Sequence, residues 1–221
     1  MQTLIFNIFR RYHFFLSLHG VLAILFLNLP ILATMHSLVV LPVGIYFVLK
    51  KNNPDTAICV ISYILGCETL WRAFNATLIW EYSKYSIIII LALAIFRLGP
   101  KKIKQKLGLL CIILLLPSLL VMDELNRVSV SHALSGPFLI GLSMLIFSNY
   151  YVGRKQIISI LKLFLLPSAG FALLAFNGTI AGDEISYYSV YTKKTTTAGL
   201  GANQVSNMLG LGSLFSFLLF N

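Results

Sequence analysis

Apolar blocks of membrane-spanning length alternate with short polar segments along this chain of 221 residues. A run of roughly 17–25 apolar residues is what an α-helix needs to cross a bilayer. A backbone in lipid must satisfy its own hydrogen bonds, so these blocks are expected to be helices. Hydrophobic residues make up 58% of the sequence and charged residues only 11%, which agrees with this pattern. The sequence predicts an all-α, multi-pass transmembrane helical bundle.

The apolar blocks predict about eight spans. The second block is short and contains Pro42 and Gly44, and the fifth contains Pro117. Proline is tolerated within a span because neighbouring helices can satisfy the carbonyl that it leaves unpaired. We expect residues 1–221 to form a single integral membrane domain. The blocks run approximately over residues 14–32, 35–49, 56–71, 85–98, 107–122, 132–150, 157–176 and 205–220.

The basic residues collect in every second polar segment. Cytoplasmic segments of membrane proteins carry an excess of Lys and Arg, which predicts a cytoplasmic N-terminus. With that orientation, twelve of the 17 cations lie inside, and six of the seven acids lie outside. A different number of spans would mix these groups, so the charge pattern favours the count as well as the orientation. The outside cations are Arg72, Lys84, Arg127, Lys193 and Lys194, and the outside acids are Glu68, Glu81, Asp123, Glu124, Asp183 and Glu184.

The remaining composition argues against several classes of function. The net charge of +10 comes from cations between apolar blocks rather than from one basic stripe, so we expect no nucleic-acid partner. Cys59, Cys67 and Cys111 fall in or beside apolar blocks without metal-ligand spacing and read as small buried hydrophobic residues. The sequence contains no phosphate-binding loop, zinc signature or nucleophile elbow. No metal and no cofactor are predicted.

The outside segments hold the candidate binding residues. Arg72 follows Glu68 by four residues, so the two can pair on one helix face, while Trp71 and Trp80 favour the membrane interface. Anchoring with a local ion pair is one interpretation of this segment. The alternative is that Arg72 faces a cavity and holds a phosphate, for which its planar guanidinium is suited. Arg127, in the next outside segment, either belongs to a solvated loop or binds phosphate in the same way.

A third outside segment ends in TTTAGLGANQVSNMLGLGSL, residues 195–214. It predicts a tight loop that leads into a helix, with Asn203 or Ser206 as a cap. Exposed amides at such a helix start can hold an anion. Gly210 and Gly212 would let another helix approach closely.

Within this segment, GLGANQVSNMLGLGSLFSF resembles the part of the bacterial O-antigen ligase and O-antigen polymerase family in which a Gly/Asn turn opens a membrane helix. The turn here carries Gly201 and Asn203, with Ala202 where the family more often has proline. The layout is also similar, with many spans, short loops and a longer outside segment, residues 177–204, directly before the motif.

The resemblance implies a membrane glycosyltransferase of the bacterial inner membrane. Members move a glycan from an undecaprenyl-pyrophosphate carrier to a lipid, polysaccharide or protein acceptor at the periplasmic face, without a cofactor. Their catalytic histidine and arginines lie in a large loop further along the chain, and nothing here matches it. We therefore assign no catalytic residue, and expect this sequence to be the N-terminal portion of a longer protein, inactive alone. Ligase and polymerase remain open alternatives.

The expected partners are the undecaprenyl-pyrophosphate-linked glycan and membrane lipids. Cations are needed to neutralise the charge of a departing pyrophosphate. Two other classes stay open: a polysaccharide or lipid transporter or flippase, and a non-catalytic membrane subunit. A transporter predicts inverted repeats and charges at the bilayer midplane, neither of which is visible here. The substrate-binding candidates are Arg72, Arg127, Lys193 and Lys194.

Overall fold

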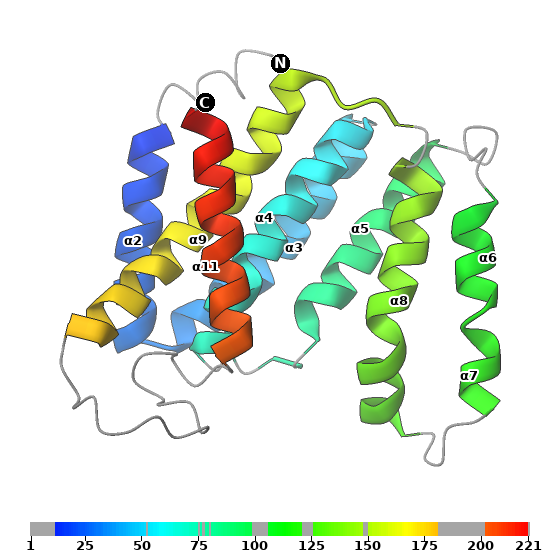
Figure 1. The fold of residues 1–221 in the computed structure, drawn as a ribbon, viewed down its shortest axis with the longest axis horizontal. Helices are drawn as coiled ribbons and strands as arrows, with labels where there is room; N and C mark the ends of the chain where they lie inside the picture. Colours follow the sequence, from blue (N-terminus) through cyan, green and yellow to red (C-terminus); the bar gives the residue numbers. More distant parts are fainter. Residues whose placement is uncertain are drawn as a thin grey trace. The chain divides into compact units, whose positions relative to one another are not determined.

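The regular structure of this protein is α-helical. The computed structural model describes residues 12–51, 53–74, 76, 78–79, 81–98, 106–120, 126–147, 150–180 and 202–220, and these residues form helices and turns without any strand. The all-α prediction is confirmed for this part of the chain. The helices are α2 (Tyr12–Asn28), α3 (Ile31–Lys51), α4 (Pro54–Ala73), α5 (Tyr82–Leu98), α6 (Leu107–Ile113), α7 (Leu116–Leu120), α8 (Arg127–Phe147), α9 (Arg154–Ile180) and α11 (Ala202–Phe220), as Figure 1 shows.

The first boundary differs from the prediction. The first apolar block was expected to reach residue 32, but α2 ends at Asn28 and α3 begins at Ile31. Pro30 explains the difference, because proline disfavours the helical conformation of the preceding Leu29 and lacks an N–H. The chain turns at these two residues, and the Pro30 carbonyl accepts the Ala33 N–H at 3.0 Å. His36 therefore belongs to the second turn of α3.

The fifth apolar block is not one continuous helix. It consists of α6 and α7, which are separated by a tight turn at Leu114 and Leu115. Pro117 has no N–H to donate to Ile113, so the regular helical ladder is interrupted one turn before it. The Leu115 N–H bonds instead to the Ile112 carbonyl at 3.1 Å, three residues back.

Three helices among the described residues are long and apolar enough to cross a membrane, judged by length and composition. They are Ile31–Lys51, Ser129–Phe147 and Arg154–Asn177. Tyr12–Asn28 and Leu107–Ser118 are apolar but shorter. These helices indicate a membrane protein, while the count of eight spans stays a prediction.

The chain divides into two compact units. Unit 1 comprises Met1–Leu38, Leu65–Leu78 and Ile157–Asn221, and unit 2 comprises Val39–Ile64 and Ile79–Gln156. Two of the boundaries between the units fall within α3 and α4, so each of these helices has one part in unit 1 and one part in unit 2.

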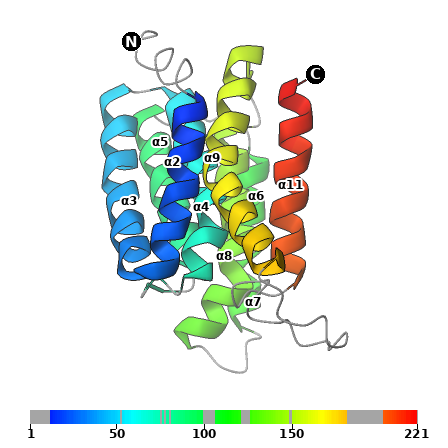
Figure 2. The same ribbon diagram turned by 90° about the vertical axis from the view of Figure 1, so that its left-hand side faces the viewer.

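Unit 1 has an aromatic core that α2, α3, α4, α9 and α11 build together. Two glycines let the helices approach to backbone contact. A Cβ on Gly66 of α4 would lie 2.5 Å from the Phe164 carbonyl oxygen of α9, and one on Gly170 would lie 2.7 Å from the His19 carbonyl oxygen of α2. Figure 2 shows α2 and α9 side by side. The buried core residues are Ala23, Phe26, Ala33, Leu70, Ala73, Phe74, Phe164, Phe171, Leu174 and Met208.

Unit 2 is also held by close glycine contacts. A Cβ on Gly108 of α6 would lie 2.6 Å from the Gly141 carbonyl oxygen of α8. Cys111 and Met144 bring their sulfur atoms to 3.9 Å across the same pair of helices. The free thiol of Cys111 packs between α6 and α8 but is only partly buried, as is that of Cys59, so of the three cysteines the predicted burial is found at Cys67.

Candidate functional site

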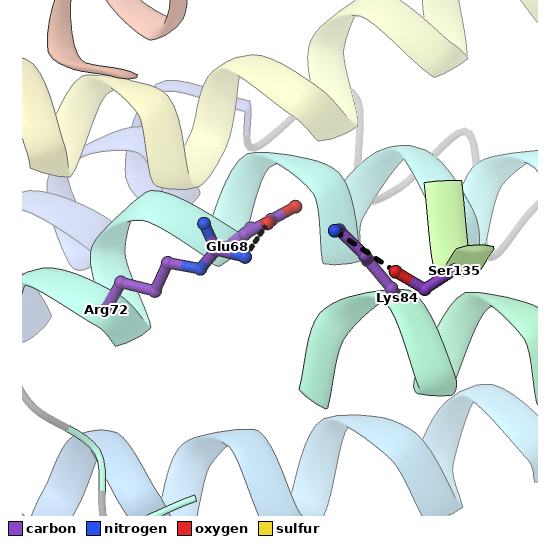
Figure 3. A network of polar contacts seen from close by, with 4 residues as sticks. All are labelled: Glu68, Arg72, Lys84 and Ser135. Atoms are coloured by element: carbon purple, nitrogen blue, oxygen red, sulfur yellow. Dashed lines mark hydrogen bonds and ion pairs between the residues drawn. The ribbon is translucent and has the colours of Figure 1, made fainter. Parts of the chain in front are cut away.

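Arg72 lies in the last turn of α4 and forms an ion pair with Glu68. The guanidinium Nη2 is 2.6 Å from the Glu68 Oε1, and the two side chains are 14% and 20% exposed (Figure 3). The four-residue spacing that the sequence shows therefore produces the expected pair on one helix face. A cation in the last turn also interacts favourably with the helix dipole. The pair is fixed in position by α4 and largely shielded from solvent.

Trp71, beside this pair in the sequence, is buried inside unit 1. Its Nε1–H donates to the His36 Nδ1 at 2.9 Å, and the side chain is only 4% exposed. The accepting nitrogen carries no proton, so His36 is held as a neutral ring with its proton on Nε2. Phe26 packs against His36 with ring centroids 5.6 Å apart, and Phe74 packs against Phe26 at 5.8 Å. Sequence reasoning missed this cluster, because no local spacing connects residues 36 and 71.

His19, the ionisable residue that lies within the first apolar block, is buried in unit 1. Its Nδ1 lies 2.7 Å from the Phe15 carbonyl oxygen, one turn earlier in α2. This bond satisfies one ring nitrogen within the same helix.

Unit 2 contains a second polar cluster, which joins the first turn of α5 to α8. The Lys84 Nζ donates to the Ser135 Oγ at 3.2 Å (Figure 3), and the Tyr85 hydroxyl donates to the Ser131 Oγ at 2.7 Å. Both serines are 6% exposed and lie one turn apart on α8. The sequence indicated only Lys84, as an outside cation, because the serines become partners through helix packing rather than through spacing.

The other predicted binding residues are only partly described. Arg127 is the first residue of α8, and only its backbone is described. Lys193, Lys194 and Gly201 lie outside the described residues.

The motif segment after residue 201 forms α11. Asn203 is exposed and is the second residue of this helix. The Ser206 hydroxyl donates to the Asn203 carbonyl at 3.2 Å, so both residues lie inside the helix rather than at the position that precedes it. The prediction that Asn203 or Ser206 caps the helix is therefore wrong, because neither residue precedes α11.

Among the described residues, no three His, Cys, Asp or Glu side chains gather where they could hold a metal ion. No family model, no curated protein and no solved structure matches the chain. The candidate sites are therefore interpreted from their own geometry, together with the motif of residues 199–217.

Proposed function

We propose that this chain is a multi-pass protein of the bacterial inner membrane, with about eight spans and a cytoplasmic N-terminus. We propose further that it resembles O-antigen ligases and polymerases in function. It would then contribute to the transfer of a glycan from an undecaprenyl-pyrophosphate carrier to an acceptor at the periplasmic face. The segregation of charge along the sequence carries the orientation, and the resemblance of residues 199–217 to the O-antigen ligase and polymerase motif carries the proposed activity.

The helix ends support the orientation. Lys50 and Lys51 lie in the last turn of α3, and Arg97 lies in the last turn of α5. Both ends face the cytoplasm in the proposed topology, and the ammonium groups of the two lysines lie over aromatic rings. The Lys50 Nζ lies 5.1 Å from the Tyr46 ring centroid and the Lys51 Nζ 5.8 Å from that of Phe47. Long cationic side chains arranged in this way bring their charge to the membrane surface.

Arg72 is the best candidate for contact with the substrate. It ends a helix that runs outward in the proposed topology, and Glu68 holds its guanidinium in place. A guanidinium has five N–H donors in a fixed plane, so it can bind a carboxylate and phosphate oxygens together. Glu68 would orient the fork, and the arginine would supply positive charge to the carrier pyrophosphate.

The charge of Arg72 suits the chemistry of glycan transfer. A bond forms between an acceptor hydroxyl oxygen and the anomeric carbon, while the bond from that carbon to the pyrophosphate breaks. The pyrophosphate leaves with the electron pair, so its negative charge grows, and a fixed cation beside it lowers the barrier. The proton of the acceptor hydroxyl passes to a base, to which no residue of this chain is assigned.

The test uses glycan transfer in cells that depend on the protein. Arg72→Ala should lower transfer by about 100-fold, the usual effect of removing one stabilising donor from a transition state. Arg72→Lys should recover part of this loss, because the charge remains but the paired geometry does not. The matched control is Arg97→Ala, which removes an arginine that donates to the Leu49 carbonyl and lies on the cytoplasmic side in the proposed topology.

Membrane insertion of each variant is checked by fractionation. Full transfer in both Arg72→Ala and Arg127→Ala, with normal insertion, would reject the substrate-binding assignment.

A further inference from the structure

We infer that the first turn of α5 and the facing turns of α8 bind the phosphate group of a membrane lipid, with Lys84 and Ser135 at the centre. Tyr85 and Ser131 complete this phosphate cluster, which lies entirely within unit 2. The inference rests on the membrane orientation proposed above, but it requires no glycan transfer.

The cluster is a built arrangement from two helices that are far apart in the sequence. Lys84 bonds to Ser135 across 51 residues, and Tyr85 bonds to Ser131 across 46. Both serine side chains are buried, while Lys84 is half-buried. A half-buried ammonium group therefore lies beside two buried serines.

The cluster is rich in hydrogen-bond donors. Each serine oxygen is the acceptor in its bond, so these two bonds leave the hydroxyl protons of Ser131 and Ser135 unused. An ammonium group has three protons, and Ser135 takes one of them. Phosphate oxygens only accept hydrogen bonds and carry negative charge, and bonds of this kind to an ammonium group are among the stronger ones in proteins. The donor set therefore fits phosphate better than it fits a cation.

The position on α5 favours a lipid over a free ion. Lys84 is the third residue of the helix, and the apolar run Ile87–Ile90 follows directly. Ile89, one turn after Tyr85 on the same helix face, is 41% exposed and offers apolar surface to an acyl chain, whereas Ile87 and Ile90 are buried. A headgroup phosphate at Lys84 would thus lie at the level where the polar and apolar parts of α5 meet.

Glu81 provides a check on the sign of the electrostatic effect. It immediately precedes α5, three residues before Lys84, and is 4% exposed. A carboxylate at this spacing lowers the positive potential at Lys84. Glu81→Gln should therefore strengthen phosphate binding, whereas loss of the lysine charge should weaken it.

The experiment measures binding of dihexanoyl phosphatidic acid to the full chain in nanodiscs of zwitterionic lipid. Lys84→Gln and Ser135→Ala should each raise the Kd by about tenfold or more, because each removes part of a charge-assisted hydrogen bond. Lys84→Arg and Ser135→Thr, which keep the charge and the hydroxyl, should bind close to wild type.

The matched control is Lys50→Gln. Lys50 also donates to a hydroxyl, that of Tyr46 at 2.8 Å, but it lies at the opposite end of the spans in the proposed topology. Its replacement should leave the Kd unchanged. Monodisperse elution and a single cooperative unfolding transition establish that each variant is folded.

Three results would overturn the inference. The first is unchanged affinity in folded Lys84→Gln, and the second is equal binding of the phosphate-free dihexanoyl glycerol. The third is displacement of the lipid by inorganic phosphate at a similar concentration, which would assign the site to a free ion instead. The proposed function is tested separately, because glycan transfer can depend on Arg72 even if the binding of phosphatidic acid does not depend on Lys84.

Discussion

The two units hold their helices together in different ways. Unit 1 uses an aromatic core, which includes a bond between Trp71 and His36. Unit 2 joins α5 to α8 through an ammonium group and hydroxyls, at Lys84 with Ser135 and Tyr85 with Ser131. The apolar blocks that build the two units look alike in the sequence. The comparison teaches that hydrophobicity specifies the helices, whereas a few polar or small residues specify which helix surfaces meet.

The largest effect on stability is expected from blocking the close glycine contacts, which both units contain. Gly66→Ala and Gly108→Ala should each destabilise the protein by about 2–3 kcal/mol, since overpacking against a neighbour costs this much. In both cases the new Cβ would meet a backbone oxygen, at 2.5 and 2.6 Å, which cannot rotate away. Unfolding in mixed micelles measures the change.

Gly210→Ala is the control for these variants. A Cβ on Gly210 would meet no atom within 4 Å, so the better helix propensity of alanine should stabilise α11 by about 0.5–1 kcal/mol. A similar loss of stability in all three variants would mean that close packing does not cause the effect.

The next prediction concerns the polar bond inside unit 1. Trp71→Phe removes the donor to His36 and should cost about 1–3 kcal/mol, because a partly buried acceptor loses this bond. His36→Leu should cost a similar amount. The double variant should cost less than the sum of the two, since no polar atom of this pair then remains unpaired. Strict additivity in the unfolding measurements would show that the two rings are not coupled.

The smallest predicted effect comes from comparing two bonds of unit 2, the partly buried one between Tyr85 and Ser131 and the exposed one between Lys50 and Tyr46. Tyr85→Phe removes the donor to the buried Ser131 and should cost about 0.5–1.5 kcal/mol. Tyr46→Phe, at a side chain that is 54% exposed, should change stability by no more than about 0.5 kcal/mol. Equal losses of stability in the two variants would show that burial does not decide how much these bonds contribute.

Local patterns in the sequence predicted what depends on local structure. The apolar blocks correspond to the described helices, and the four-residue spacing predicted the pair of Glu68 and Arg72. The effect of Pro30 was also local, and the first boundary was misplaced because the apolar run continues past it to Leu32. The break in the fifth block at Leu114 follows in the same way from Pro117.

Contacts between distant segments could not be predicted in this way. Ser135 has no feature in the sequence that marks it as a partner of Lys84, because their contact depends on the packing of α5 against α8. The same holds for His36 and Trp71, which are 35 residues apart. Of the predicted binding cations, Arg72 alone has a described side chain, and the roles of Arg127, Lys193 and Lys194 stay predictions.

The orientation in the membrane is the central claim, and cysteine labelling tests it most directly. Cys59, Cys67 and Cys111 are first replaced by serine or alanine, and Ile103→Cys and Val190→Cys are then introduced separately. An impermeant maleimide should label position 190 from the periplasmic side in cells with an intact inner membrane, and position 103 only after that membrane is opened. Labelling of both positions from the same side would contradict the proposed topology and the outward location of Arg72 and Lys84.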